Sequence, residues 1–121
     1  MPAKKNIPFD FIFDYLPSSI SIKPAFGMYF IYLDSKIILV LCKRQKAPEL
    51  NGVWIGTYKE FHTALMAEIP GAKVLNENPI GRQSSWLLLP ASCDNFEQGV
   101  LITCELISKH DYRIGKPISP A

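Results

Sequence analysis

The chain has 121 residues, of which 48% are hydrophobic and 20% are charged, the size and composition of one ordinary globular domain. We therefore expect residues 1–121 to form a single domain, and we exclude a disordered chain or a long coiled coil. Thirteen basic and eleven acidic side chains give a formal charge of +2, far from the balance of a dedicated nucleic-acid-binding protein. No apolar stretch approaches the roughly 20 residues that span a bilayer, so no membrane association is predicted.

The first predicted element is a short helix over residues 8–16, which Pro17 ends. Most of its side chains are apolar, so the helix should dock against the rest of the domain. Asp10 and Asp14 lie four residues apart and resemble a carboxylate pair. We interpret them as two solvated charges on the polar stripe of the helix.

Three strands are predicted next, over residues 20–23, 28–33 and 36–43. Asp34 and Ser35 form a two-residue turn between the last two strands. Apolar side chains point to both sides of this hairpin, so both faces of the sheet should be covered. We expect helices on one face and a loop, a ligand or a partner on the other.

Residues 53–69 predict a strand that leads into a helix, with the strand at 53–56 and the helix at 58–69. Thr57 and Glu60 have the spacing of a capping box, in which each side chain satisfies a backbone donor at the helix start. His62 lies beside the apolar stripe of this helix. A histidine with one satisfied hydrogen bond is more common there than a catalytic base.

The remaining pattern predicts two strands and one helix. The strands cover residues 72–75 and 85–89, with a polar loop at 76–81 between them. The helix covers residues 94–109, and Asp94 and Glu97 form a second capping pair. Its buried stripe is predicted to contain Phe96, Val100, Thr103, Cys104 and Ile107. The tail over residues 112–121 is rich in Pro and Gly, and we expect it to be extended or disordered.

Together these elements predict an α+β fold. We expect a two-layer sandwich in which a mainly antiparallel sheet of about five strands is packed by three helices, in the order α-β(3)-α-β(2)-α.

The sequence offers no recognisable catalytic or metal-binding pattern. A nucleophilic triad needs a base, and only His62 and His110 are available for that role. Neither lies in a known motif, and His110 suits the C-terminal end of a helix as a partner of the helix dipole. The carboxylates are scattered without metal-ligand spacing. We therefore predict no catalytic residue, no metal site and no cofactor.

The three cysteines, Cys42, Cys93 and Cys104, have no C-x-x-C spacing, so neither a disulfide framework nor a zinc site is predicted. They fit a reducing compartment, and a bacterial-type cytoplasmic protein is the simplest interpretation. Cys42 precedes Lys43 and Arg44, cations that would favour its thiolate. We prefer ordinary burial as the interpretation of Cys42, and Cys104 is expected to be an inert core residue.

Three short motifs carry a family resemblance. The segment Phe26-Gly27-Met28-Tyr29-Phe30-Ile31-Tyr32-Leu33-Asp34-Ser35-Lys36-Ile37 resembles the opening pattern of the TfoX N-terminal domain family. That pattern is roughly Met-Phe-Gly-x-Tyr-Gly-x-Tyr, followed by a turn and Lys-Ile. Pro70-Gly71-Ala72-Lys73 is similar to a later family motif, and residues 86–90 are similar to its aromatic strand that ends in proline. The likeness covers about residues 20–109, with Ala25 and Phe30 where the family usually has Met and Gly.

The resemblance implies a two-layer α+β fold whose element order is similar to that of secretion chaperones and, distantly, of YjbR-type domains. Members of the family are linked to competence regulation in bacteria, without a securely assigned enzymatic activity. The shared residues build the hairpin, so no functional role is carried over residue by residue.

Three functions remain open. The first is a non-enzymatic protein-interaction or regulatory module, with a protein partner or as a homodimer. Its interface would be the sheet face or Leu101 and Ile102, which fall outside the apolar stripe of the last helix.

The second is a small-molecule-binding domain or an unassigned enzyme, with a pocket between the sheet and the helices. The lining predicted for this pocket is Tyr29, Tyr32, Trp54, His62 and Trp86.

The third is nucleic-acid binding through a basic patch. The patch would comprise Lys43, Arg44 and Lys46, joined in space by Lys109, Arg113 and Lys116. The alternative interpretation of these side chains is a solvated surface.

Overall fold

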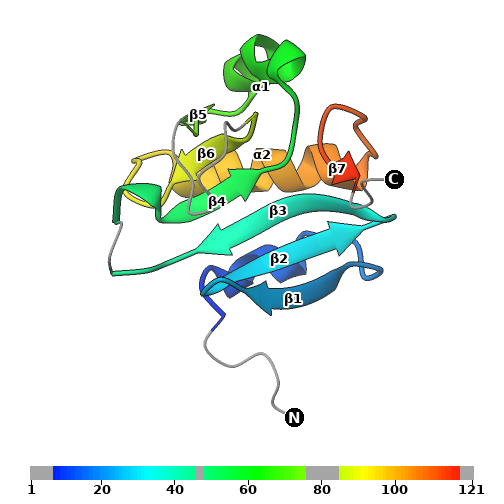
Figure 1. Ribbon diagram of the computed structural model, residues 1–121. Helices are drawn as coiled ribbons and strands as arrows, with labels where there is room; N and C mark the ends of the chain where they lie inside the picture. The colour runs from blue at the N-terminus through cyan, green and yellow to red at the C-terminus, as the bar shows by residue number, and fades with distance from the viewer. Residues whose placement is uncertain (1–6, 46–47, 76–84, 118–121) are drawn as a thin grey trace.

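The computed structural model describes residues 7–45, 48–75 and 85–117 (Figure 1). Its strands are β1 (Ser21–Ala25), β2 (Met28–Leu33), β3 (Lys36–Cys42), β4 (Gly52–Ile55), β5 (Lys73–Val74), β6 (Leu87–Pro90) and β7 (Lys116–Pro117). Its α-helices are α1 (His62–Glu68) and α2 (Phe96–Ser108), and short 3₁₀ helices are η1 (Asp10–Asp14), η2 (Pro48–Leu50) and η3 (Lys59–Phe61). Neither described α-helix is long and apolar enough to cross a bilayer.

The strands form one seven-stranded sheet in the order β1-β2-β3-β4-β6-β5, and every pairing is antiparallel. The seventh strand, β7, pairs with Lys36 and Ile37 at the start of β3. The chain at Gly56 links this pairing to β4: the Gly56 N–H donates to the Ile38 carbonyl (2.9 Å), and the Gly115 N–H donates to the Gly56 carbonyl (2.6 Å). The C-terminal segment is thus fastened to the middle of the sheet.

The α+β class is confirmed, but the prediction of about five strands packed by three helices is wrong. Strand β7 has two residues, too few to give a periodic pattern, and β5 keeps only two of the residues predicted as a strand over 72–75. The predicted first helix is instead the 3₁₀ helix η1, preceded by Phe9 in a left-handed conformation (φ 56°). The segment between Pro8 and Pro17 is too short to sustain an α-helix without strong local support.

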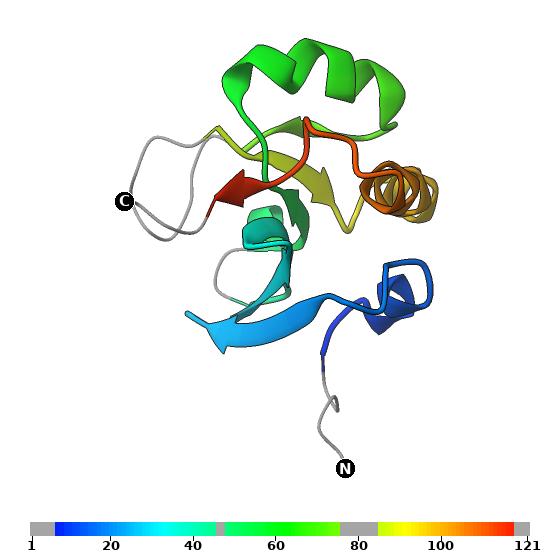
Figure 2. The same cartoon turned by 90° about the vertical axis from the view of Figure 1, so that its right-hand side faces the viewer.

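One face of the sheet carries the main core. Figure 2 shows α2 and η1 on the same side of the sheet, and the two Phe rings at 9 and 96 lie 5.1 Å apart between them. The predicted stripe of α2 is confirmed, since its five residues are all buried. The sheet contributes alternate residues, as a period of two requires: Ile31, Leu39, Leu41, Val53, Ile55, Leu87 and Leu89.

A β-bulge in the β2–β3 pairing changes this alternation at one point. Ile31 pairs with Leu39 and Tyr32 pairs with Ile37, which leaves Ile38 without a partner across the ladder. As a result, Ile38 and Leu39 both belong to the main core although they are adjacent in sequence. The bulge therefore sends an additional aliphatic side chain towards the end of α2.

The opposite face of the sheet has a second, smaller core, so the predicted two-sided burial of the hairpin is confirmed. Its buried members are Met28, Val40, Cys42, Trp54, Leu75 and Leu88. Leu50 of η2 packs against this cluster, and its carbonyl accepts a hydrogen bond of 2.9 Å from Trp54 Nε1. Asn51 connects the same segment to the backbone of Arg44 through two hydrogen bonds.

Gly99 sets the distance between α2 and the sheet. A Cβ atom at this position would lie 2.7 Å from the Pro70 carbonyl oxygen and 2.9 Å from both terminal carbons of Leu89. Real Cβ atoms do not approach other atoms this closely, so only glycine permits the packing.

Both predicted capping pairs are wrong. The α-helix α2 begins at Phe96 after Asn95, and no side chain caps it. The first turn after β4 begins at Lys59 after Tyr58, again without a side-chain cap. The hydroxyl of Thr57 is used elsewhere, because it donates a hydrogen bond of 2.6 Å to the Arg113 carbonyl.

Candidate functional site

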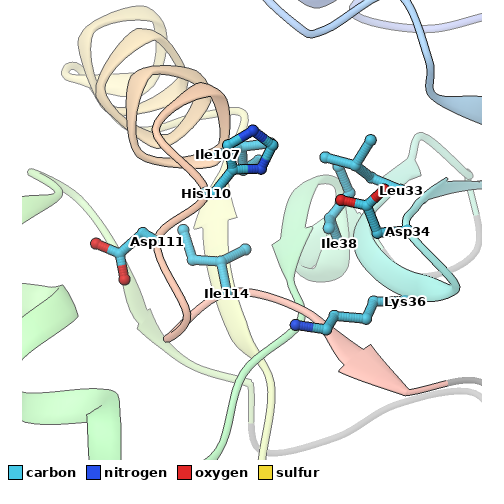
Figure 3. Close-up of a pocket in the computed structure, with 8 residues that line it drawn as sticks. All are labelled: Leu33, Asp34, Lys36, Ile38, Ile107, His110, Asp111 and Ile114. Atoms are coloured by element: carbon cyan, nitrogen blue, oxygen red, sulfur yellow. The ribbon is translucent and has the colours of Figure 1, made fainter.

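The end of α2, the β2–β3 turn and the segment after α2 surround a cavity of about 100 Å³, which we call the His110 pocket (Figure 3). Four aliphatic side chains form its floor: Leu33, Ile38, Ile107 and Ile114, each at most 7% exposed. Four ionisable side chains lie around them: Asp34, Lys36, His110 and Asp111. The β-bulge thus contributes Ile38 to this floor, and the segment after α2 contributes Ile114.

His110 ends α2 in a Schellman motif. Its N–H donates to the Ile107 carbonyl (2.9 Å), and the N–H of Asp111 donates to the Leu106 carbonyl (3.0 Å). The motif requires a left-handed residue, and His110 has φ 59°. Glycine is the usual residue there, because any other side chain costs about 1 kcal/mol in this conformation.

The β2–β3 turn also has non-glycine residues in the left-handed conformation. It is the two-residue turn predicted from the sequence, and Asp34 (φ 54°) and Ser35 (φ 66°) are both left-handed. Such turns favour glycine, yet neither position has one. Asp34 and His110 therefore line opposite sides of the pocket, and each has a left-handed backbone conformation that costs free energy.

The four ionisable groups of the pocket differ in their partners. Asp111 is bound by Arg113. The Nε atom of Arg113 lies 2.9 Å from Oδ1 of Asp111, and its Nη2 atom lies 2.7 Å from Oδ2. Arg113 also binds both carboxylate oxygens of Glu68, at 2.9 Å each. The hydrogen bonds from Arg113 lower the pKa of Asp111 and of Glu68. The carboxylate of Asp111 is therefore already engaged by Arg113 at the wall of the pocket.

The other three groups have no such partner. Within the part of the chain that the structure describes, no side-chain hydrogen bond or ion pair involves Asp34, Lys36 or His110. Three unpaired polar groups thus surround an aliphatic floor, the general composition of a small-molecule site.

A second polar cluster holds residues 111–117, which we call the C-terminal strap, to the sheet. Lys116 Nζ lies 2.6 Å from Ser85 Oγ, 3.4 Å from the Thr57 carbonyl and 4.2 Å from the centre of the Tyr58 ring. Burial lowers the pKa of Lys116.

A serine beside a lysine can act as a nucleophile and its base. Here, however, Ser85 Oγ donates to the Thr57 carbonyl (2.9 Å), and His62 Nε2 donates to the Ser85 carbonyl (2.5 Å). The prediction that His62 has one satisfied hydrogen bond is confirmed. Since the bonds of this cluster join the strap to the chain around Thr57 and Ser85, we assign it a structural role.

The five residues of the predicted aromatic pocket lie on different parts of the sheet. Tyr29 packs against the main core, whereas Trp54 and Trp86 form an edge-to-face pair in the second core, with ring centres 6.5 Å apart. Tyr32 lines a shallow cavity of about 230 Å³ with Lys23, whose Nζ lies 5.3 Å from its ring. His62 is at the strap. The structure therefore pairs Trp54 with Trp86 but does not bring all five side chains into one pocket.

The large hydrophobic side chains that are exposed among the described residues are Tyr15, Phe26, Tyr58, Leu101 and Tyr112. Leu101 on α2 is 40% exposed, whereas its neighbour Ile102 packs partly against the main core. Phe26 is 69% exposed at the β1–β2 turn, in a left-handed conformation (φ 55°) next to Gly27 (φ 77°). Its ring lies 6.4 Å from that of Phe30.

Of the two interpretations of Cys42, the preferred one, ordinary burial, is confirmed, and the activated thiol is not. Cys42 is buried, and burial raises its thiol pKa more than the charge of Arg44 lowers it. Cys104 is buried as predicted, and burial raises its pKa to about 12. In the described ranges Cys42, Cys93 and Cys104 are all free.

Among the described residues, three of the six cations of the predicted basic patch are engaged. Arg113 is paired with two carboxylates, Lys109 lies 3.2 Å from Glu105, and Lys116 is held at Ser85. Lys46 lies outside the described residues. Among residues 7–45, 48–75 and 85–117, no group of three or more His, Cys, Asp or Glu side chains could hold a metal ion.

Comparison of the chain with protein-family models, curated proteins and solved structures gave no match. The geometry of the His110 pocket is therefore the ground for a functional proposal.

Proposed function

We propose that this domain is a non-enzymatic regulatory module that binds a small molecule in the His110 pocket. The observation that carries the proposal is the pairing of Asp34 and His110 across one cavity. Both residues have left-handed backbones, both are ionisable, and both line the same aliphatic floor.

Residues in costly backbone conformations cluster at functional sites, where the side chain is needed in spite of the strain. Glycine at either position would relieve about 1 kcal/mol. The helix dipole favours a histidine at the end of α2, and aspartate tolerates a left-handed turn, but neither effect gives a reason for both residues to line one aliphatic floor. A ligand that contacts both side chains gives one.

The volume of the pocket limits the size of that ligand. At about 100 Å³ the cavity is below the range of drug-sized sites. Apolar cavities of roughly 150 Å³ in other proteins accept benzene. The ligand therefore has the size of a short branched chain, with an apolar body on the floor and a polar head at the mouth.

The lining favours binding over catalysis. It contains no serine or cysteine that could act as a nucleophile. The nearby Ser85 and Lys116 are committed to holding the strap, as their hydrogen bonds indicate.

An NMR titration of the ¹⁵N-labelled domain tests the proposal. A panel of small alcohols, amines, carboxylates and amino acids is added to about 10 mM, enough to detect affinities near 1 mM, or roughly 4 kcal/mol of binding free energy. We expect saturable shifts at residues 33–38 and 107–114 for at least one compound. Residues 87–90 of β6 serve as the internal control. Shifts that are absent, or that spread evenly over the domain, would contradict the proposal.

A second candidate function is protein interaction through the β1–β2 turn, favoured by the exposure of Phe26. An aromatic side chain that is both strained and exposed is the kind of anchor that interfaces use. Sedimentation velocity over micromolar concentrations tests for a homodimer. We expect self-association that Phe26→Asn abolishes and Leu101→Ala retains; a strict monomer rules the homodimer out.

The TfoX-like ancestry and a cytoplasmic location belong to the same proposal. The three free cysteines support a reducing compartment. The two-sided hairpin supports the resemblance, because it is the part of the chain in which the family motif lies.

A further inference from the structure

We infer that the ligand of the His110 pocket is a free α-amino acid with a branched aliphatic side chain. This inference rests on the proposed function and adds the chemical class of the ligand. It follows from the charges that remain unpaired around the pocket and from the shape of its floor.

The pocket has one available negative charge and one permanent positive charge. Of its two carboxylates, Asp111 is already held by two hydrogen bonds from the Arg113 side chain, which leaves Asp34 as the one without a side-chain partner in the described part of the chain. Lys36 provides the positive charge, and no ion pair joins it to Asp34 in the described part of the chain. A ligand that satisfies both groups must itself carry both charges.

The two charges are held at different sides of the floor. Figure 3 shows Asp34 next to Leu33, facing His110, whereas the Lys36 side chain reaches towards Ile114. Gly115 leaves room for this reach, since a Cβ atom there would lie 2.9 Å from Lys36 Cδ. One end of a ligand head can therefore meet Asp34 while the other meets Lys36.

An ammonium group is further favoured on the side of Asp34. His110 ends α2, and the C-terminal end of a helix carries a partial negative charge that attracts cations. The ammonium would donate to Asp34 near this helix end, and the carboxylate would accept from Lys36. Charge-assisted bonds of both kinds are stronger than neutral ones.

Ligands with a single charge fit this arrangement less well. A simple carboxylate could pair with Lys36 but would leave Asp34 unpaired beside a like charge. A simple amine would satisfy Asp34 and leave Lys36 unpaired. A singly charged ligand makes one charge-assisted bond where the zwitterion makes two, so the zwitterion should bind more tightly than either.

The floor selects the side chain. Leu33, Ile38, Ile107 and Ile114 are all aliphatic and branched, and they provide no polar atom for a ligand side chain to bond. Branched chains of three or four carbon atoms match both this chemistry and the small volume of the cavity.

Three compounds with the same isobutyl body test the inference: L-leucine, 4-methylpentanoate and 3-methylbutylamine. Their affinities are measured by NMR titration on the intact domain, with glycine as the control that lacks the body. We expect L-leucine to bind at least tenfold more tightly than the other two and glycine not to bind.

Two single variants assign the charges. Asp34→Asn keeps a residue that tolerates the left-handed turn and should lower the affinity for L-leucine about tenfold without lowering the affinity for 4-methylpentanoate. Lys36→Met should lower the affinity for L-leucine without lowering the affinity for 3-methylbutylamine.

The outcomes separate this inference from the proposed function. If 4-methylpentanoate or 3-methylbutylamine binds as tightly as L-leucine, the amino-acid assignment is wrong and the pocket remains a ligand site. If none of the isobutyl compounds shifts residues 33–38 and 107–114, the inference fails. If the wider panel also fails, the proposed function fails with it.

Discussion

The two turns at the ends of β2 solve the same geometric problem with different residues. Phe26-Gly27 and Asp34-Ser35 both place two left-handed residues between antiparallel strands. The first turn has glycine at its second position, and its aromatic residue is exposed to solvent. The second has no glycine, and its aspartate lines the His110 pocket.

The difference shows that strain alone does not mark a binding site. What distinguishes the second turn is that its costly residue adjoins an aliphatic cavity and lies opposite another costly residue, His110. Backbone strain, a cavity and unpaired charged side chains occur together at the second turn, and a bound ligand is the simplest single explanation of the three.

The largest expected effect concerns the floor beneath the second turn. Ile107→Ala should lower the free energy of unfolding by about 2–5 kcal/mol, because it leaves a cavity in the main core. Leu101→Ala, on the exposed side of the same helix, should cost less than about 1 kcal/mol. Urea denaturation of both variants checks the prediction, and equal losses would show that the floor is not part of the core.

Exchanging the glycine pattern of the two turns should change stability in opposite directions. Ser35→Gly creates the favoured Asp-Gly turn and should raise the free energy of unfolding by about 1 kcal/mol. Gly27→Ser should lower it by a similar amount through conformation alone, since its Cβ would meet only Arg44 side-chain atoms at 3.9 Å. Thermal unfolding measures both changes. A Ser35→Gly variant that is no more stable than the wild type would mean that this turn is not strained.

The carboxylates bound by Arg113, of which Asp111 lines the pocket, make the free energy of unfolding depend on pH. Arg113 lowers the pKa of Asp111 and Glu68 in the folded state, so the unfolded state takes up protons first as the pH falls. The stabilisation is complete above the ordinary values of 3.8 and 4.5 and is lost as the pH falls below them. Arg113→Gln should therefore have a flatter stability profile below pH 4.5. Urea midpoints measured from pH 3 to pH 7 provide the test, and parallel profiles for the two proteins would disprove this role of Arg113.

The smallest effect is expected at the first turn. Phe26→Asn replaces an exposed aromatic by a residue that tolerates the left-handed conformation, so stability should rise by about 0.5 kcal/mol. Ligand affinity at the His110 pocket should not change, because Phe26 does not line it. A change in the affinity for L-leucine would show that the two ends of β2 are coupled.

Most of the hairpin and the last helix could be predicted from the sequence. The unbroken apolar run of β3 indicated burial on both faces, and the stripe from Phe96 to Ile107 indicated the buried side of α2. Both patterns lie within short stretches of the sequence, and burial in the core stabilises the elements that they predict. Strand β7 lacked such a pattern, because its pairing with β3 is a tertiary contact. The local pattern overestimated two other elements, since the predicted first helix is the 3₁₀ helix η1 and the predicted strand over 72–75 keeps two residues in β5.

The His110 pocket could not be predicted, because Asp34 and His110 are far apart in sequence and nothing local places the end of α2 against the β2–β3 turn. Two local signals did point to the residues themselves. One is an Asp-Ser pair where Asp-Gly is favoured, and the other is a histidine where a helix usually ends in glycine. At Cys42 the sequence shows the neighbouring cations directly, and the structure confirms that burial outweighs their effect on the thiol pKa.

The most direct test of the ligand site is His110→Gly, with stability and binding measured on the same variant. Glycine relieves the left-handed residue at the end of α2, so the free energy of unfolding should rise by about 0.5–1 kcal/mol. The same change removes one side of the pocket mouth, so NMR titration with L-leucine should show at least a tenfold loss of affinity. A variant that is more stable and still binds as well as the wild type would contradict the claim that His110 is kept for a ligand.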